Sequence, residues 1–588
     1  MDNWAYNLLV FIFLWTYSYM VYLACNHGLA PNARLQQLIR YLVGSLVAVT
    51  PLFIVNTYPL QPAILLSLIV SLSWIITYPL LYHLTNRKFA PDYDHQIDEV
   101  FGLYLFGMLT SLLMLPICRW IVGIVIFIFF FVCVVQWCYY LICDTCIDAR
   151  GMKMLQETHY NEILEFLRSY SFIYILLICL GLILIAIVCV CIPLLWPVFP
   201  VEVDIWCTTI LMIIVLSIMW YMFKLHHGLV SRIGVVQLFI TVREYVKNNA
   251  RYIDMQQKRL NNLDVRSITP MEEAHTILLV IGESASRDFM SAFTPITEDT
   301  TPWLRTLSED EHHCILFPNA YSCDIQTVPT LERALTECNQ YDDGEFYQSC
   351  SIVDIARKLG YRVHWYSNQG HLGAADTPVT LVANTADVAK WTRQELGKPQ
   401  YDETLLDFLD EIDPTQRNVV VLHLKGSHFN YENRFKESTR QWGAPKSHDK
   451  ITNYKNTLYY TDTVLRSFYE YSRSRLNLQA MIYCSDHADV PDRHRQPNIG
   501  GFRDLRIPLM VWLSDEFQNL RPRCVEALRT NRTLYWTNDL LYDLFCGLLD
   551  IESNHFHVEN SLTSLDYRFT REQLIAMGGK IRIAEDEN

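Results

Sequence analysis

Uninterrupted apolar runs fill the first 223 of the 588 residues, and they constrain the fold more than any other feature. The stretch from 121 to 135, for example, carries no charge and has no polar face. A helix that crosses a membrane explains such a run better than a buried core helix does. Runs of about the required length lie near residues 5–25, 41–56, 60–82, 102–117, 120–143, 172–197 and 205–223. Because 41–56 and 102–117 are short, we predict five to seven α-helical spans in a transmembrane domain of residues 1–223.

Two less apolar segments have the pattern of helices near a membrane surface. Residues 157–170 mix apolar and charged side chains with a helical period. This pattern fits an amphipathic helix on the bilayer or, equally well, a polar helix between spans. Residues 224–262 are basic and helical in pattern. We therefore predict a helical linker over residues 224–270, close to the bilayer.

The overall charge excludes one large class of partner. The chain has 48 Lys and Arg against 62 Asp and Glu, a formal net charge of -14. No basic stripe is present to neutralise phosphates, so we expect no nucleic-acid partner. An acidic chain is not attracted to an anionic bilayer either, so its attachment must come from the apolar spans.

The 17 cysteines give only weak information on the redox compartment. Ten precede residue 224 and lie in or beside apolar runs, where a thiol behaves as a small hydrophobe. Cys338 and Cys350 bracket a short acidic loop and are a candidate disulfide if the domain faces an oxidising compartment. The odd total leaves at least one thiol unpaired.

From residue 275 onward the sequence alternates short apolar strands with helices, which predicts an α/β domain over residues 271–588. Each predicted strand ends in a polar, potentially reactive cluster. Because parallel α/β sheets place ligand sites at the carboxyl ends of their strands, we expect these clusters to converge. The predicted strands are 276–281, 362–366, 418–424, 480–483 and 509–512.

Three clusters contain residues suited to chemistry, although each also has an ordinary explanation. Glu283 follows a strand and a glycine turn, where an acidic helix cap is common. Asp486 and His487 follow another strand, where such a pair is most often a hydrogen-bonded surface pair. Thr327 precedes Pro329, which suits the first turn of a helix, so Thr327 alone is best read as an N-cap.

Together the clusters supply three oxygens and one nitrogen, a plausible tetrahedral zinc set of Glu283, Thr327, Asp486 and His487. A threonine hydroxyl is a poor nucleophile because its pKa is very high, and zinc coordination stabilises the alkoxide. The start of a helix is also a favourable place for a phosphate. Positioning and charge neutralisation are what phosphoryl transfer mainly requires.

The ordered set resembles the bacterial lipid A and lipopolysaccharide phosphoethanolamine transferases, which include the mobile colistin-resistance enzymes. The motifs that carry this resemblance are Gly282-Glu283-Ser284, Ser322-Cys323 with Thr327 and Pro329, Gly426-Ser427-His428, and Ser485-Asp486-His487. The resemblance implies a transmembrane helical bundle followed by an α/β sulfatase-like domain of the alkaline phosphatase superfamily. It also implies that Glu283, Thr327, Asp486 and His487 bind zinc and that Thr327 is the nucleophile.

Further residues are assigned by the same resemblance. His428 matches a family histidine near the substrate phosphate, which donates to a phosphoryl oxygen or protonates the leaving group. His494 is a candidate for the other active-site histidine, with a surface-loop position equally good, and Asn368 is a candidate contact to the substrate. Many family members continue the Asp-His pair with Gly-Glu, whereas this chain has Ala488 and Asp489, so Asp489 is a candidate replacement for that carboxylate. The flanking cysteine pair of some members is not reproduced, because Arg333 stands where a partner to Cys323 is expected.

The function implied is transfer of phosphoethanolamine from phosphatidylethanolamine to lipid A or another lipopolysaccharide acceptor, through a covalent adduct on Thr327. Two alternatives stay open: a glycerophosphate transferase of the lipoteichoic acid synthase type, and an inactive membrane-anchored sensor or scaffold. The resemblance implies a monomer in the bacterial inner membrane, with the catalytic domain in the periplasm. The basic residues of alternate loops would instead place that domain in the cytoplasm if there were seven spans. Our prediction follows the resemblance, since a miscount of one span reverses the orientation.

Overall fold

The structure is a computed structural model, and it divides the chain into two compact units. One unit comprises residues 1–155 and 170–244, and the other comprises 156–169 and 245–588. The predicted borders at residues 223 and 270 stay a prediction. The structure describes residues 8–16, 61–81, 95–114, 119–143, 180–187, 251–252, 254–342, 344–369, 378–392, 401–492 and 501–587, with the single positions 5, 42, 45, 46, 49, 147, 206, 210, 213, 243, 247 and 399.

The first unit is helical where it is described. Its longer helices are α3 (Gln61–Ile75), which continues into a short π-helix (Ile76–Leu80), α5 (His95–Met114) and α6 (Arg119–Cys143). Within the described residues, Val122–Tyr140 of α6 is the one helix long and apolar enough to cross a membrane, and Ile64–Tyr78 and Phe101–Thr110 are shorter apolar helices. Three of the predicted runs are therefore helical, while the number of spans stays a prediction.

Close packing joins α3 to α5. A Cβ at Gly102 would lie 2.6 Å from Cγ1 of Ile75, so only glycine allows this approach. Ser71 donates a hydrogen bond of 2.6 Å to the Gly102 carbonyl, and the Trp74 indole donates one of 3.2 Å to Asp98. These contacts satisfy polar groups between two otherwise apolar helices.

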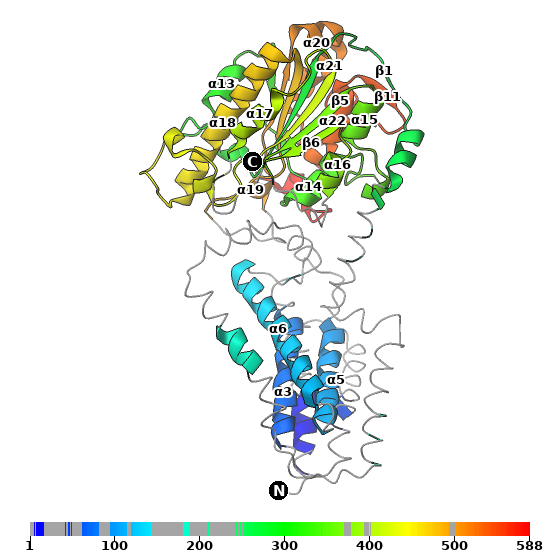
Figure 1. The fold of residues 1–588 in the computed structure, drawn as a ribbon, viewed down its shortest axis with the longest axis vertical. Helices are drawn as coiled ribbons and strands as arrows, with labels where there is room; N and C mark the ends of the chain where they lie inside the picture. Colours follow the sequence, from blue (N-terminus) through cyan, green and yellow to red (C-terminus); the bar gives the residue numbers. More distant parts are fainter. Residues whose placement is uncertain are drawn as a thin grey trace. The chain divides into compact units, whose positions relative to one another are not determined.

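The second unit is built on a seven-stranded sheet (Figure 1). The strand order is β3-β9-β8-β2-β7-β5-β6. Five neighbouring strands are parallel, whereas β9 runs antiparallel to both β8 and β3. The bounds are β2 (Thr276–Gly282), β3 (Cys314–Leu316), β5 (Arg362–Ser367), β6 (Val388–Trp391), β7 (Asn418–His423), β8 (Leu478–Ser485) and β9 (Leu509–Leu513).

All five predicted strands are present, but one expectation about them is wrong. We expected every strand to end at the same edge of the sheet. The segment 509–512 lies in β9, which runs antiparallel to β8. Ser514 and Asp515 therefore follow β9 on the side of the sheet where β2 and β8 begin, not where they end. Direction is set by the connection between strands, which the apolar pattern does not encode.

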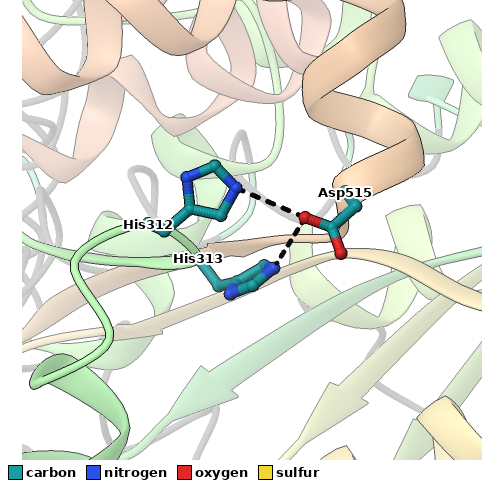
Figure 2. Close-up of side chains that lie close together, drawn as sticks. All are labelled: His312, His313 and Asp515. Atoms are coloured by element: carbon teal, nitrogen blue, oxygen red, sulfur yellow. Dashed lines mark hydrogen bonds and ion pairs between the residues drawn. The ribbon is translucent and has the colours of Figure 1, made fainter.

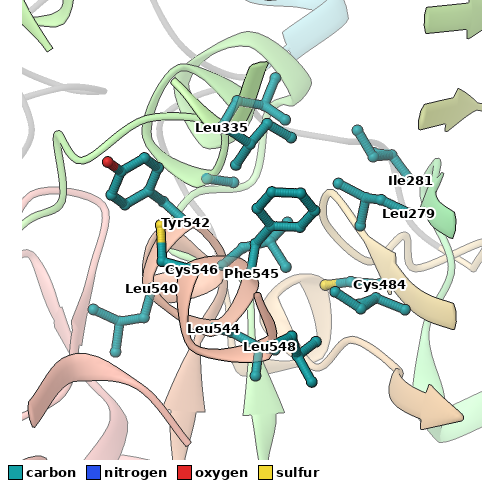
Figure 3. Packing of buried hydrophobic residues seen from close by; sticks show 14 of the residues in the cluster. Leu279, Ile281, Leu335, Cys484, Leu540, Tyr542, Leu544, Phe545, Cys546 and Leu548 are labelled. Carbon is teal, nitrogen blue, oxygen red and sulfur yellow. The ribbon is translucent and has the colours of Figure 1, made fainter. Parts of the chain in front are cut away.

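Both faces of the sheet are covered by helices, and side chains of β2 alternate between two cores. Leu279 and Ile281 point into one core with Phe545 and Leu548 of α22, as Figure 3 shows. Leu278 and Val280 point into the other core. The first face carries α14 (Thr327–Ala334), α15 (Ile352–Lys358), α16 (Pro378–Ala383) and α22 (Leu541–Leu548), and the second carries α13 (Pro302–Ser308), α17 (Leu406–Leu409) and α18 (Lys450–Arg475).

Short elements complete the unit. Three strand pairs lie outside the main sheet: β1 (Val265–Ser267) with β11 (Ile551–Ser553), β4 (Ala320–Tyr321) with β10 (Trp536–Thr537), and β12 (Ile575–Ala576) with β13 (Ile581–Arg582). The remaining helices are α19 (Phe502–Leu505), α20 (Asp515–Leu520) and α21 (Pro522–Thr530). Cys338 and Cys350 are both thiols, so the candidate disulfide is not formed.

Candidate active site

The structure brings the three predicted clusters together at the carboxyl ends of β2 and β8 and the start of α14. The Thr327 hydroxyl donates to Oε2 of Glu283 at 3.0 Å and lies 3.4 Å from Nε2 of His487. Nε2 of His487 lies 3.5 Å from Oε1 of Glu283 and 3.4 Å from Oδ2 of Asp486. The ligand atoms of Glu283, Asp486 and His487 all lie within 4.8 Å of one another.

Backbone bonds between the two strand ends hold this cluster. Ser284 has a φ of 58°, and in this left-handed conformation its N–H donates to Oδ1 of Asp486 at 2.9 Å. The Asp486 N–H returns a bond of 3.1 Å to the carbonyl of Gly282. The Ser284 hydroxyl donates to Oε1 of Glu283 at 2.6 Å, which fixes the carboxylate. The turn after β2 therefore orients both carboxylates.

Burial makes it costly to ionise the carboxyl groups of this cluster. Glu283, Asp486 and His487 are at most 1% exposed. Loss of water, together with the neighbouring Asp486 carboxylate, raises the pKa of Glu283 to about 8. Burial also raises the pKa of Asp486. Oδ2 of Asp486 has no hydrogen-bond partner among the described residues, so a buried acceptor faces the centre of the cluster.

The donor set fits a zinc ion. Nδ1 of His487 lies 2.9 Å from the Ala488 carbonyl, so this nitrogen carries the proton and Nε2 presents its lone pair to the cluster. Two carboxylates, one imidazole nitrogen and the Thr327 oxygen are ligands that tetrahedral zinc accepts. A cation here would also satisfy the orphaned oxygen of Asp486 and offset the paired carboxylates.

The loop after β7 carries His428 and is bonded directly to the turn that holds Glu283. The Ser427 N–H donates to the Glu283 carbonyl at 2.9 Å. Gly426 has a φ of +48°, and a Cβ there would lie 2.7 Å from the Glu283 carbonyl oxygen. Asp402 accepts from the Gly426 N–H at 2.9 Å. His428 itself is half-buried, and Arg434 donates to its carbonyl at 3.4 Å.

The other predicted site residues differ in their surroundings. Asn368 is buried, and its amide donates to Asp402 at 2.8 Å and accepts from Thr392 at 2.6 Å, so it braces the loop below the cluster. Asp489 accepts from the Tyr431 hydroxyl at 2.8 Å. His494 lies outside the described residues.

Sequence reasoning missed two polar residues beside Glu283. The Gln369 amide donates to Oε2 of Glu283 at 3.4 Å and to the Leu424 carbonyl at 2.6 Å. The Lys425 ammonium donates to Oε1 of Gln369 at 3.2 Å. Both residues directly follow predicted strands, and this position at a strand end could have identified them.

Comparisons with known proteins agree with this geometry. Residues 275–548 match the Sulfatase family model. The second unit is therefore similar to the sulfatase family. The chain is 26% identical over 272 residues to phosphoethanolamine transferase EptC of Escherichia coli K12, covering 43% of this chain and 47% of that protein. It is 28% identical over 302 residues to phosphoethanolamine transferase OpgE of the same organism, covering 47% and 54%.

The chain thus spans about half the length of the curated relatives it matches. A structural likeness extends into the first unit of the chain. The integral membrane lipooligosaccharide phosphoethanolamine transferase A of Neisseria meningitidis has a TM-score of 0.58 at 17% identity, covering 85% of this chain and 98% of that one. The predicted fold class, a helical membrane domain followed by a sulfatase-like domain, is confirmed, as is the family resemblance.

Proposed function

We propose that this protein is a membrane enzyme that transfers phosphoethanolamine from phosphatidylethanolamine to a lipopolysaccharide acceptor, with Thr327 as nucleophile. One observation carries the proposal: the Thr327 hydroxyl lies at the start of α14, 3.0 Å from Glu283 and 3.4 Å from His487. The relatives support it, because they are named phosphoethanolamine transferases, and one is a Kdo(2)-lipid A phosphoethanolamine 7''-transferase.

In this proposal Glu283, Thr327, Asp486 and His487 hold the zinc. When bound, zinc supplies a charge that stabilises the threonine oxygen as an anion and polarises a phosphoryl oxygen. The Thr327 hydrogen bond directs its proton toward a carboxylate oxygen and leaves a lone pair for the phosphorus. The free N–H groups of α14 favour the negative phosphoryl oxygens.

The chemistry proceeds in two displacements. Thr327 Oγ1 forms a bond to phosphorus, the bond from phosphorus to the diacylglycerol oxygen breaks, and His428 supplies the proton to that oxygen. An acceptor oxygen then attacks the same phosphorus and passes its proton to His428, and the bond to Thr327 breaks as Oγ1 regains its proton from Glu283. His494 and Asn368 are proposed to help bind substrate, with Asn368 oriented by its hydrogen bonds to Asp402 and Thr392.

A mass measurement tests the proposal and its main rival together. The full chain in detergent is incubated with phosphatidylethanolamine or with phosphatidylglycerol, and the peptide that contains Thr327 is weighed. We expect a phosphoethanolamine adduct from the first lipid only, and no adduct in Thr327→Ala. A glycerophosphate adduct would favour the lipoteichoic acid synthase type of activity, and no adduct with either lipid would favour a sensor or scaffold. Full transferase activity in Thr327→Ala would refute the role of Thr327.

We also propose that the protein is a multi-pass monomer of the bacterial inner membrane with its catalytic domain in the periplasm. The integral membrane relative supports the membrane setting. A reporter fused after residue 230 tests the orientation, because a periplasm-dependent reporter should be active there and a cytoplasm-dependent one inactive.

A further inference from the structure

We propose that His312, His313 and Asp515 form a second site for a divalent transition-metal ion of the zinc class. The site lies at the edge of the main sheet opposite the candidate active site. His312 and His313 immediately precede β3, and Asp515 follows β9. Since β3 and β9 are antiparallel and pair Cys314 with Trp512, the start of one and the end of the other meet at this edge.

The two histidine rings both point to one carboxylate oxygen of Asp515, as Figure 2 shows. Nε2 of His312 lies 3.3 Å and Nε2 of His313 lies 3.1 Å from the same oxygen, Oδ1 of Asp515. All three ligand atoms lie within 4.8 Å of one another. The two rings are nearly perpendicular, at 83°, so their nitrogens approach the carboxylate from different directions. Without an ion, each Nε2 must carry a proton to interact favourably with the anionic oxygen of Asp515. A bound cation would take the place of these protons.

His313 is held in place before any ion binds. Its Nδ1 lies 2.6 Å from Oδ2 of Asp310, and its ring stacks on Trp512 at 6.2 Å and 20°. Its backbone is fixed by bonds of 3.0 Å to the Asp310 carbonyl and 2.9 Å from the Leu513 N–H. A carboxylate on the far nitrogen is the usual way proteins orient a metal-binding histidine, because it fixes the tautomer that leaves Nε2 unprotonated.

Charges around the cluster work in both directions. Glu309, Glu311 and Glu516 are acidic neighbours in sequence, which favours a cation. Arg529 opposes one, since its guanidinium donates to the His312 carbonyl at 2.9 Å and lies 3.4 Å from Nδ1 of the same ring. Gln518 also accepts a hydrogen bond from this guanidinium, at 2.7 Å.

The ligand types identify the class of ion. Two imidazole nitrogens and one carboxylate oxygen suit zinc and its neighbours rather than calcium or magnesium, which prefer oxygen ligands. The side chains of His312 and Asp515 are 58% and 74% exposed, so water completes the coordination shell. The ion would fasten the loop before the edge strand β3 to the end of β9, which is a structural role. This proposal does not depend on the proposed transferase function.

Zinc stoichiometry tests the site directly. The full chain in detergent is equilibrated with micromolar Zn²⁺ and its bound metal is counted by elemental analysis. His312→Ala/His313→Ala should lose one equivalent relative to the wild type, and His557→Ala, a matched exposed histidine, should lose none. In an Asp486→Asn background, which removes a ligand of the buried cluster, the same pair of substitutions should abolish the remaining equivalent.

Equal stoichiometry in the wild type and in His312→Ala/His313→Ala would overturn the site and leave a surface group of hydrogen bonds and ion pairs. If that double variant does not fold, Asp515→Asn takes its place, with an expected loss of affinity of at least about tenfold. A failed transferase hypothesis would show itself differently, as an absent adduct on Thr327 with the equivalent at His312 and His313 still bound.

Discussion

The two clusters of histidine and carboxylate lie at opposite edges of one sheet and differ most in their contact with water. At the ends of β2 and β8 the side chains of Glu283 and His487 are at most 1% exposed. At the other edge the side chains of His313 and Asp515 are 24% and 74% exposed. Buried carboxylates have lost their hydration and need a cation to be stable in ionised form, whereas exposed ones keep water as an alternative. In our proposals the buried cluster therefore depends on its ion, whereas the exposed one can exist without an ion.

The largest effect should come from removing a proposed metal ligand from the buried cluster. Asp486→Asn should lower transferase activity by at least about a thousandfold, because about 4 kcal/mol of transition-state stabilisation by the ion is lost. Activity assays with phosphatidylethanolamine and metal analysis measure both consequences. His312→Ala/His313→Ala is the control and should keep full activity. Near-normal activity in Asp486→Asn would show that the buried cluster is not the metal centre.

Asp543 is a buried carboxyl outside both clusters. It tests whether burial alone is enough to make an ionised carboxylate unstable. Burial raises the pKa of Asp543 to about 7, although Asn560 and the His557 N–H donate to it. The native state keeps this proton up to about pH 7, whereas the unfolded chain loses it near 3.8, so stability should fall as pH rises from about 4 to 7. The loss is at most about 4 kcal/mol at pH 8.

Asp543→Asn keeps an acceptor and removes the charge, so it should flatten this pH dependence. We expect the variant to melt at a higher temperature than the wild type at pH 8 and at a similar temperature near pH 4, measured on the full chain in detergent. An identical melting profile across this pH range would mean that Asp543 is ionised throughout.

A smaller effect should come from the loop that is bonded to the buried turn. His428→Ala should lower kcat by about a hundredfold if His428 delivers the leaving-group proton, with little change in KM. A leaving group that needs no proton should restore most of the rate. The matched control is His557→Ala, which should leave kcat unchanged. A change in KM alone would assign His428 to substrate binding.

The smallest effect belongs to the exposed edge. Asp310→Asn should weaken zinc binding at His312 and His313 by about tenfold, because the amide is a poorer partner for Nδ1 than a carboxylate. Titration of the Asp486→Asn background with Zn²⁺ measures this affinity. Transferase activity in the otherwise wild-type chain should not change. Unaltered zinc affinity would mean that the ring of His313 is oriented by Trp512 alone.

Much of this arrangement was predictable from local sequence, and the rest depends on contacts between distant segments. Apolar runs and turn residues mark the five strands, and Glu283, Asp486 and His487 converge because the parallel strands β2 and β8 end side by side, whereas Thr327 joins them from the start of α14. The reversed direction of β9 was not predictable from its own residues. Because β9 runs the opposite way, Asp515 lies at the other end of the strands, beside His312 and His313, which carry no recognisable motif.

Tertiary contacts also assigned unexpected partners. Asn368 follows a strand, and its amide is bonded to Asp402 and Thr392, while its contact with substrate stays a prediction. Asp402 binds the backbone of Lys425 and Gly426 from a distant part of the chain. Such pairings follow from strand order, which has no local signature.

The position of β8 between β2 and β9 has a consequence for biogenesis. Ser284 and Asp486, which are hydrogen-bonded across these strands, are 202 residues apart in sequence. The ribosome delivers Glu283 and Thr327 long before Asp486 and His487, so the proposed zinc site is incomplete until β8 has emerged and joined the sheet. Zinc acquisition should therefore be among the last steps of maturation, and a chain that stops before residue 485 should accumulate as a metal-free product.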